Sequence, residues 1–188
     1  MYSASDLRKG LKIELDGEPY VVTQFEFCKP GKGQALYRSK LKNMLTGSTL
    51  DKTFRSVDKI DKPNLEEREL LYSYFDGMNY VFMDAESYDQ VTIPEDVLGD
   101  QRHLLQEDAQ CSVLFFQDRA IGVTLPYFVE MTVAETEPGA RGDTATNVTK
   151  PAKVEGGYEI HVPLFVNEGD VVRIDTRTGE YSERVSKA

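Results

Sequence analysis

Short runs of alternating apolar and polar residues, separated by turns that contain glycine or proline, dominate the chain. Residues 12–15 alternate, Asp16-Gly17 predicts a tight turn, and residues 19–27 form a second run rich in Val, Phe and Tyr. Residues 34–42 alternate again. Many short strands at this spacing are typical of small β-barrels and β-sandwiches, so the pattern predicts an all-β protein.

The same pattern divides the chain. Residues 59–69 are polar, charged and interrupted by Pro63, which favours a domain boundary. A second unit follows, with hairpins expected around residues 76–77 and 117–119 and one helical stretch at 94–109 that Gly99 interrupts. A third unit begins near residue 129, with strands expected at 158–166 and 170–176. We therefore expect three small domains, at residues 1–64, 65–128 and 129–188.

Charge is unevenly distributed along the 188 residues, whose net charge is −10. Residues 1–62 hold 12 Lys and Arg against 8 Asp and Glu, whereas residues 63–128 hold 3 against 13. Residues 27–50 contain no acidic residue and carry Lys29, Lys32, Arg38, Lys40 and Lys42. A positive surface need only be local to attract a polyanion, so this window predicts an RNA partner.

The sequence Lys29-Pro30-Gly31-Lys32-Gly33 predicts a slim hairpin tip with Lys32 at its apex. Pro30 fixes φ at the second turn position, and Gly31 would supply the positive φ that a type II turn requires at the third. On the strand that leaves the tip, alternation places Arg38, Lys40 and Lys42 on one face, where we expect them to contact an RNA backbone. The tip lacks the spacing, the final Ser or Thr and the following helix of a P-loop.

Enzymatic chemistry finds little support. His103 and His161 are far apart and lack cysteine or carboxylate partners at ligand spacing, so we expect neither a metal nor a cofactor. The two cysteines, Cys28 and Cys111, indicate no disulfide framework, and Cys111 borders an apolar strand that predicts burial in a core. No apolar run approaches the roughly 20 residues that span a bilayer, and no secretory signal begins the chain, so we expect a cytoplasmic protein without membrane contact.

Motifs along the whole chain resemble bacterial elongation factor P. At the N-terminal end these are residues 6–13, 16–20 and the tip loop at 27–35, followed by residues 45–47 and 51–55. At the C-terminal end they are Lys150-Pro151-Ala152, residues 162–166, Gly169-Asp170 and residues 175–181. The occurrence of all these motifs in order makes the resemblance specific.

The resemblance implies an SH3-like or KOW-like barrel followed by two OB-fold-like barrels, in an L-shaped arrangement that mimics a tRNA. It implies a monomer that binds the 70S ribosome between the peptidyl and exit sites, touching ribosomal RNA and peptidyl-tRNA. Lys32 would lie beside the CCA end and relieve stalling at consecutive prolines. A lysine-modifying enzyme would extend Lys32, often by β-lysylation.

The resemblance also implies contacts in the third domain. A loop near the exit-site mRNA codon matches Gly142, Asp143, Thr144 and Ala145. Tyr181 and Arg184 match positions that contact ribosome or tRNA. The alternative function is a stand-alone OB-fold module that binds single-stranded nucleic acid through stacking aromatics. Tyr37 is one such aromatic, although its apolar neighbours favour a place in the core.

Overall fold

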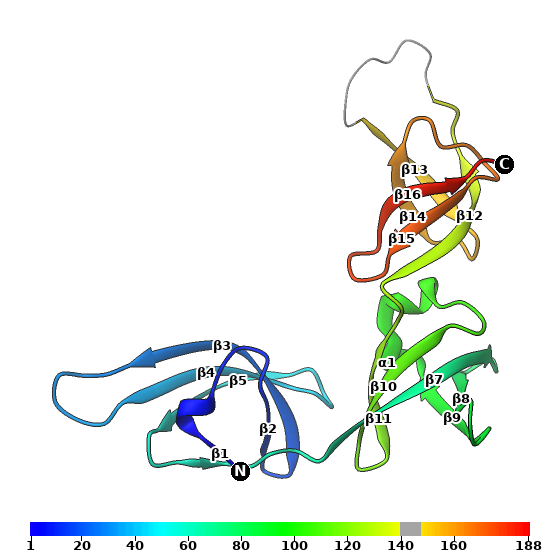
Figure 1. Ribbon diagram of the computed structural model, residues 1–188. Helices are drawn as coiled ribbons and strands as arrows, with labels where there is room; N and C mark the ends of the chain where they lie inside the picture. Colours follow the sequence, from blue (N-terminus) through cyan, green and yellow to red (C-terminus); the bar gives the residue numbers. More distant parts are fainter. Residues whose placement is uncertain (140–147) are drawn as a thin grey trace. The chain divides into compact units, whose positions relative to one another are not determined.

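The computed structural model describes residues 1–139 and 148–188 (Figure 1). By their internal contacts these residues form two compact units, residues 1–67 with 114–121 and residues 68–113 with 122–188. The elements are almost entirely β-strands, so the predicted all-β class is confirmed. No helix in the described part of the chain is long and apolar enough to cross a membrane. The division into three domains stays a prediction.

The first unit is built on a four-stranded antiparallel sheet in the order β2-β3-β4-β5. Its strands are β2 Lys12–Leu15, β3 Glu18–Cys28, β4 Leu36–Asn43 and β5 Thr49–Arg55. The predicted turn between β2 and β3 is confirmed, because Asp16 and Gly17 both have positive φ, at 53° and 78°. Ser3 precedes a short 3₁₀ helix, η1 Ala4–Asp6, and Tyr2–Ser3 (β1) pairs with Lys59–Ile60 (β6).

Alternating residues from these strands enclose one core. Its fully shielded members include Ile13, Val22 and Leu41, and Leu7 and Phe54 close it from the N-terminal segment and from β5. Burial of such side chains supplies about 1.5–3 kcal/mol each relative to exposure. The core therefore fixes which face of β4 points inward, and with it which face is left for a partner.

A five-stranded sheet follows in the order β11-β10-β7-β8-β9. Its strands are β7 Leu65–Phe75, β8 Asn79–Met83, β9 Gln90–Pro94, β10 Gln110–Phe116 and β11 Arg119–Thr124. The predicted helical stretch is short: α1 Glu95–Leu98 ends at Gly99, whose φ of 61° breaks it, and the 3₁₀ helix η2 Gly99–Leu104 continues. The strand β7 begins at Leu65, within the polar segment 59–69 where a domain boundary was expected, and that boundary stays a prediction.

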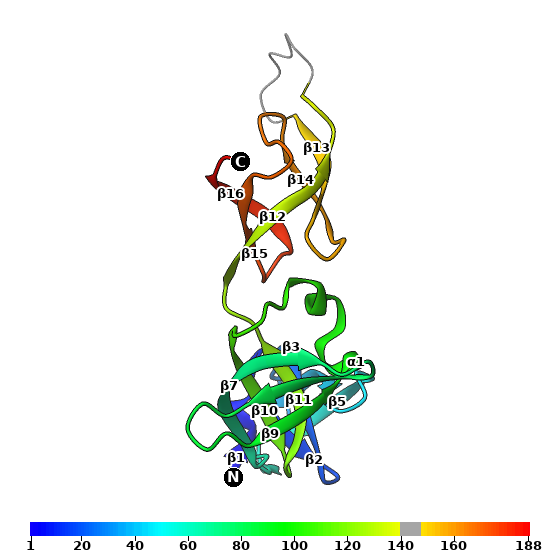
Figure 2. The same ribbon diagram turned by 90° about the vertical axis from the view of Figure 1, so that its right-hand side faces the viewer.

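The last sheet has the order β14-β13-β12-β15-β16 (Figure 2). Its strands are β12 Phe128–Thr136, β13 Thr149–Val154, β14 Glu159–Pro163, β15 Val171–Asp175 and β16 Glu180–Ser186. One end of β12 pairs with β15 and the other with β13, and a register shift between Val133 and Glu135 lies in the β13 half. The strand β12 therefore connects the β14-β13 part of the sheet to the β15-β16 part.

Candidate RNA interface

The loop that carries Lys32 joins the ends of the two longest strands of the first unit. The last β3–β4 pair is Cys28 with Leu36, so residues 29–35 lie beyond the ladder, and Figure 1 shows this loop projecting from the end of the hairpin. Lys29 and Lys32 are both exposed. A Cβ added at Gly31 or Gly33 would meet no atom within 4 Å. The tip is therefore slim and open around its lysines, as predicted.

The predicted turn type is wrong. Gly31 does not have the positive φ that a type II turn needs at its third position; Gly33 does, at 126°. The reason is the length of the loop, since the chain reverses over several residues instead of over a two-residue turn. Pro30 still restricts φ at its own position, so the loop gains stiffness there.

The strand β4 alternates as predicted. Arg38, Lys40 and Lys42 are exposed, whereas Ser39 and Leu41 are buried at 4% and 0% exposure. The opposite directions of successive side chains in a strand place the three cations on the outer face. The structure thus presents all three to solvent on the face predicted from the sequence.

The neighbouring strands bring acidic residues to the same face. Glu26 of β3 lies opposite Arg38, and Asp51 of β5 lies opposite Lys40. Lys42 instead lies between Val21 and Thr49. Cross-strand pairs of opposite charge attract each other by roughly 0.2–1 kcal/mol. Residues 27–50 contain no acid, but the fold places acids from β3 and β5 beside Arg38 and Lys40. The positive charges of this segment that have no acidic cross-strand partner are those of the tip loop and of Lys42.

A groove of about 790 Å³ lies where the N-terminal segment meets β3, β4 and β5. Its lining includes five cations and two acids: Arg8, Lys9, Arg38, Lys40 and Lys52, with Glu26 and Asp51. Local patterns in the sequence did not mark Arg8, Lys9 or Lys52 as contact residues. The backbone N–H of Gly10 donates to the carbonyl oxygen of Val22 at 2.7 Å, and this contact brings the Arg8-Lys9 pair beside β3. The sequence carries no signal for such a long-range pairing.

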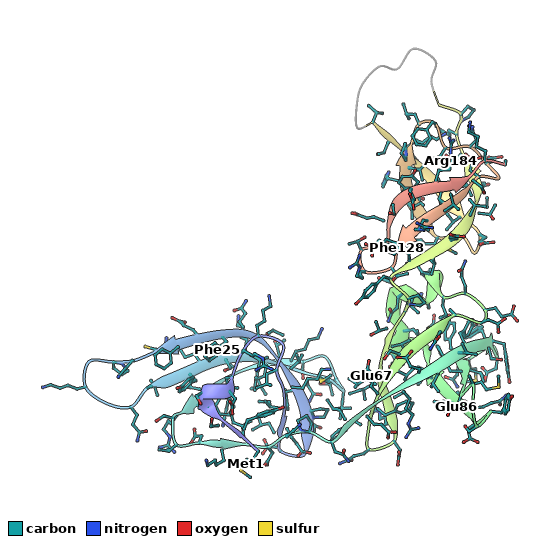
Figure 3. All side chains as sticks on the ribbon, in the orientation of Figure 1. Met1, Phe25, Glu67, Glu86, Phe128 and Arg184 are labelled. Carbon is teal, nitrogen blue, oxygen red and sulfur yellow. The ribbon has the colours of Figure 1, made fainter. Side chains whose placement is uncertain are left out.

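Three aromatic rings form a cluster on the β3–β4 hairpin. The ring centroids of Phe25 and Tyr37 are 6.0 Å apart with planes inclined by 25°, and Phe27 meets Tyr37 edge-on at 5.1 Å. Phe25 is 37% exposed and Phe27 52% (Figure 3). Tyr37 is half-buried and packs against the core cluster, which agrees with its predicted place among apolar neighbours.

The predicted contact residues near the C-terminal end make contacts within the last sheet and its loops. The Arg184 guanidinium donates to the carbonyl oxygen of Phe165 at 3.1 Å, approaches the Asp170 carboxylate at 3.5 Å and lies 4.7 Å from the Phe165 ring centroid. Tyr181 is half-buried, and burial raises the pKa of its hydroxyl. The four predicted loop residues Gly142, Asp143, Thr144 and Ala145 lie outside the described residues.

Metal-binding clusters are not apparent in the described ranges. Among residues 1–139 and 148–188, no three His, Cys, Asp or Glu side chains are placed to hold a metal ion. Cys111 is fully buried, as predicted, and burial raises the pKa of its thiol to about 11. A thiol with so high a pKa is a poor nucleophile near neutral pH. The chemistry on offer is that of a charged, aromatic binding surface.

Family models match the chain in three consecutive parts. The elongation factor P KOW-like domain matches residues 3–60, the elongation factor P OB domain matches residues 65–123, and the elongation factor P C-terminal domain matches residues 129–184. Among curated relatives, elongation factor P of Desulfosudis oleivorans is 57% identical over 187 residues, covering 100% of both chains. Elongation factor P 2 of Geobacter sulfurreducens is 50% identical over 185 residues, covering 98% of this chain and 99% of its own.

Solved structures share the fold at low sequence identity. The eukaryotic translation initiation factor 5A from Methanococcus jannaschii is 20% identical, with a TM-score of 0.52 over 66% of this chain and 92% of its own. An initiation factor 5A family protein from Naegleria fowleri is 16% identical, with a TM-score of 0.51 over 66% of this chain and 96% of its own. These likenesses support the expected combination of KOW-like and OB domains.

Proposed function

The chain belongs to the elongation factor P family and is a translation elongation factor, and from that premise we propose that Lys32 is its working residue on the ribosome. The factor occupies the space between the peptidyl and exit sites, and the tip loop reaches the CCA end of peptidyl-tRNA. There it promotes peptide-bond formation at consecutive prolines. The observation that carries the proposal is the open tip, where Lys32 is exposed and its glycine neighbours add no bulk.

Lys32 acts by position and charge in this proposal. A lysine ammonium is a compact cation with three hydrogen-bond donors, suited to RNA phosphate and sugar oxygens. Restricting a sluggish substrate to its reactive geometry can lower a barrier by about 7–11 kcal/mol in favourable systems. A tenfold acceleration requires only about 1.4 kcal/mol of this. No acid or base from the protein is needed, in keeping with a non-enzymatic factor.

The remaining roles follow from the same premise. Arg38, Lys40 and Lys42 contact RNA backbone, with Lys42 the least compensated of the three. The tip loop also contains Lys29, and Pro30, Gly31 and Gly33 keep it slim around Lys32, which a modifying enzyme extends by β-lysylation. The third domain contacts the exit-site mRNA and ribosome through residues 142–145, Tyr181 and Arg184. The protein works as a cytoplasmic monomer of three domains, bounded at 64/65 and 128/129, of which the last two are OB-like barrels.

A reporter whose synthesis requires translation through a run of prolines tests the role of Lys32. Lys32→Ala should abolish most of the stimulation, whereas Lys29→Ala should retain it. The two variants remove the same charge from the same exposed loop, so the comparison isolates position from charge. Equal activity of Lys32→Ala and wild type would overturn the proposal.

Peptide mass mapping of the protein from its native host tests the modification separately. We expect one added mass, confined to the peptide that contains Lys32, with Lys29 unmodified. An unmodified Lys32 in actively translating cells would show that the bare side chain suffices and would refute the β-lysylation step.

A further inference from the structure

Phe25 exposes an aromatic ring within the groove of the first unit. The ring is 37% exposed and lines the groove together with Arg8, Lys9 and Lys52 (Figure 3). The strand register places Phe25, Ser39 and Lys52 on one face of the sheet, whereas Arg38 and Lys40 point to the opposite face. Isolated exposed aromatics are common on protein surfaces. An exposed ring in a groove that also holds cations is a more specific combination, because it pairs a stacking surface with charges that suit phosphate.

We propose that this groove binds an unpaired RNA nucleotide, with the base stacked on Phe25 and the flanking phosphates held by Arg8, Lys9 and Lys52. The proposal rests on the proposed function for its RNA partner and adds a site that is separate from the tip. The three cations come from two separate segments, and all are exposed. They can therefore reach phosphates on either side of a bound base.

The size and charge of the groove favour a nucleotide. Its volume of about 790 Å³ falls within the roughly 300–1,000 Å³ of small-molecule clefts. Arg8, Lys9 and Lys52 give the lining three cations besides the side chains on the opposite face of the sheet, although the chain as a whole is strongly acidic. An acidic protein segment would satisfy the charges without needing a flat exposed ring, and a neutral segment would leave the cations uncompensated.

The exposed ring also favours unpaired over duplex RNA. A base inside a helix has both faces covered by its neighbours, whereas an unpaired base can be splayed out and stacked on an aromatic side chain. Ser39 lies opposite Phe25 in the β3–β4 register and belongs to the same lining. Its hydroxyl is the one buried side-chain N or O atom without a hydrogen-bond partner in residues 1–139 and 148–188. A base in the groove brings hydrogen-bonding groups beside it.

Titration of the ¹⁵N-labelled full-length protein with single-stranded hexaadenylate at low ionic strength tests the proposal. Chemical shifts should change at residues 8–9, 23–26, 38–40 and 51–53. Phe25→Ala should weaken binding at least about fivefold, the lower end of what one stacked base contributes. Shifts confined to other parts of the chain, or equal affinity of Phe25→Ala and wild type, would overturn the proposal.

Phe75→Ala is the matched control. Phe75 is 46% exposed on β7 in the other unit, so its loss removes a similar aromatic surface outside the groove. Its affinity should match that of wild type. Phe25→Leu, which keeps apolar bulk against Tyr37, should weaken binding in the same direction and serves if the alanine variant misfolds, as its amide spectrum will reveal.

A second ligand separates stacking from charge. An abasic oligomer of the same length should bind wild type and Phe25→Ala with equal affinity, because the oligomer has no base that could stack on the ring. Persistence of the fivefold difference with the abasic ligand would refute stacking. The proline reporter tests Lys32 and the comparison of Phe25→Ala with wild type tests the groove, so a failure of either proposal is distinguishable from a failure of the other.

Discussion

Arg184 holds the end of the last sheet together, and its removal should cost stability whether or not the ribosome touches it. The guanidinium donates to the Phe165 carbonyl, pairs with Asp170 and covers the Phe165 ring. The side chains of Arg184 and Asp170 are 23% and 3% exposed. A hydrogen bond to a charged group contributes about 1.5–3 kcal/mol and a surface cation–π contact about 0.5–1 kcal/mol. Allowing for partial exposure, Arg184→Ala should lose about 2–3 kcal/mol.

Hydrogen exchange of the β15 amides measures this loss in one sheet. Val172 and Ile174 are fully buried on β15, which lies between β12 and β16, so their exchange reports the opening of that sheet. Arg173→Ala is the matched control, because Arg173 pairs with Glu130 and Glu183 on a more exposed surface. Exposed pairs contribute about 0–1 kcal/mol. An Arg184→Ala loss no larger than that of Arg173→Ala would refute the reasoning.

The same site predicts a pH dependence. Backbone N–H groups of Asn167 and Ala188 donate to the Asp170 carboxylate at 2.9 and 2.8 Å, and with Arg184 nearby they lower its pKa below the ordinary value. A carboxyl whose pKa falls on folding adds stability above its unfolded pKa, and loses it as the pH falls through the folded pKa. Protection of β15 should therefore fall on acidification below the usual aspartate range, and Asp170→Asn should flatten that dependence.

Three further predictions concern single residues. Iodoacetamide should alkylate half-buried Cys28 and spare Cys111, whose thiol pKa is about 11, so mass spectrometry of the native protein should find one adduct. Ser39→Ala should raise the free energy of unfolding by about 1 kcal/mol in urea titrations, because it removes a buried hydroxyl without a partner. Gly179→Ala should lower the free energy of unfolding by about 1–3 kcal/mol in the same urea titrations, since φ is 75° and Tyr158 blocks an added Cβ. Gly156→Ala is the control: its φ is 87° but its Cβ would meet open space, so the loss should be smaller.

Local patterns predicted the hairpins well because the physical cause of each is local. Two consecutive residues with positive φ at Asp16-Gly17 and at Gln117-Asp118 close hairpins that were expected at those positions. The beginning of β7 escaped prediction because residues 65–69, Leu-Glu-Glu-Arg-Glu, contain no alternating apolar face. The strand β7 lies between β10 and β8 in its sheet, and this tertiary context, which no local pattern encodes, outweighs the local sequence.

The contact residues could be predicted from the sequence only where they all lie on one strand. Alternation along β4 predicted the exposure of Arg38, Lys40 and Lys42 correctly. The sequence window could not show that Glu26 and Asp51 would face two of them, because the register of β3 and β5 decides this. The groove escaped for the same reason, since Arg8-Lys9 and Lys52 are some 40 residues apart in the chain and meet only through the folded sheet.

This register changes how the charge of the first unit should act on RNA. Opposite charges held across neighbouring strands cancel much of each other's field beyond about 10 Å at physiological salt. Arg38 and Lys40 therefore contribute mainly at short range, once RNA is already in contact. Lys29 and Lys32 stand on a loop whose residues 29–35 include no acid, so their attraction extends further. In the proposed complex, the tip would therefore steer the approach of the RNA, while the strand face and groove would determine how firmly it is held.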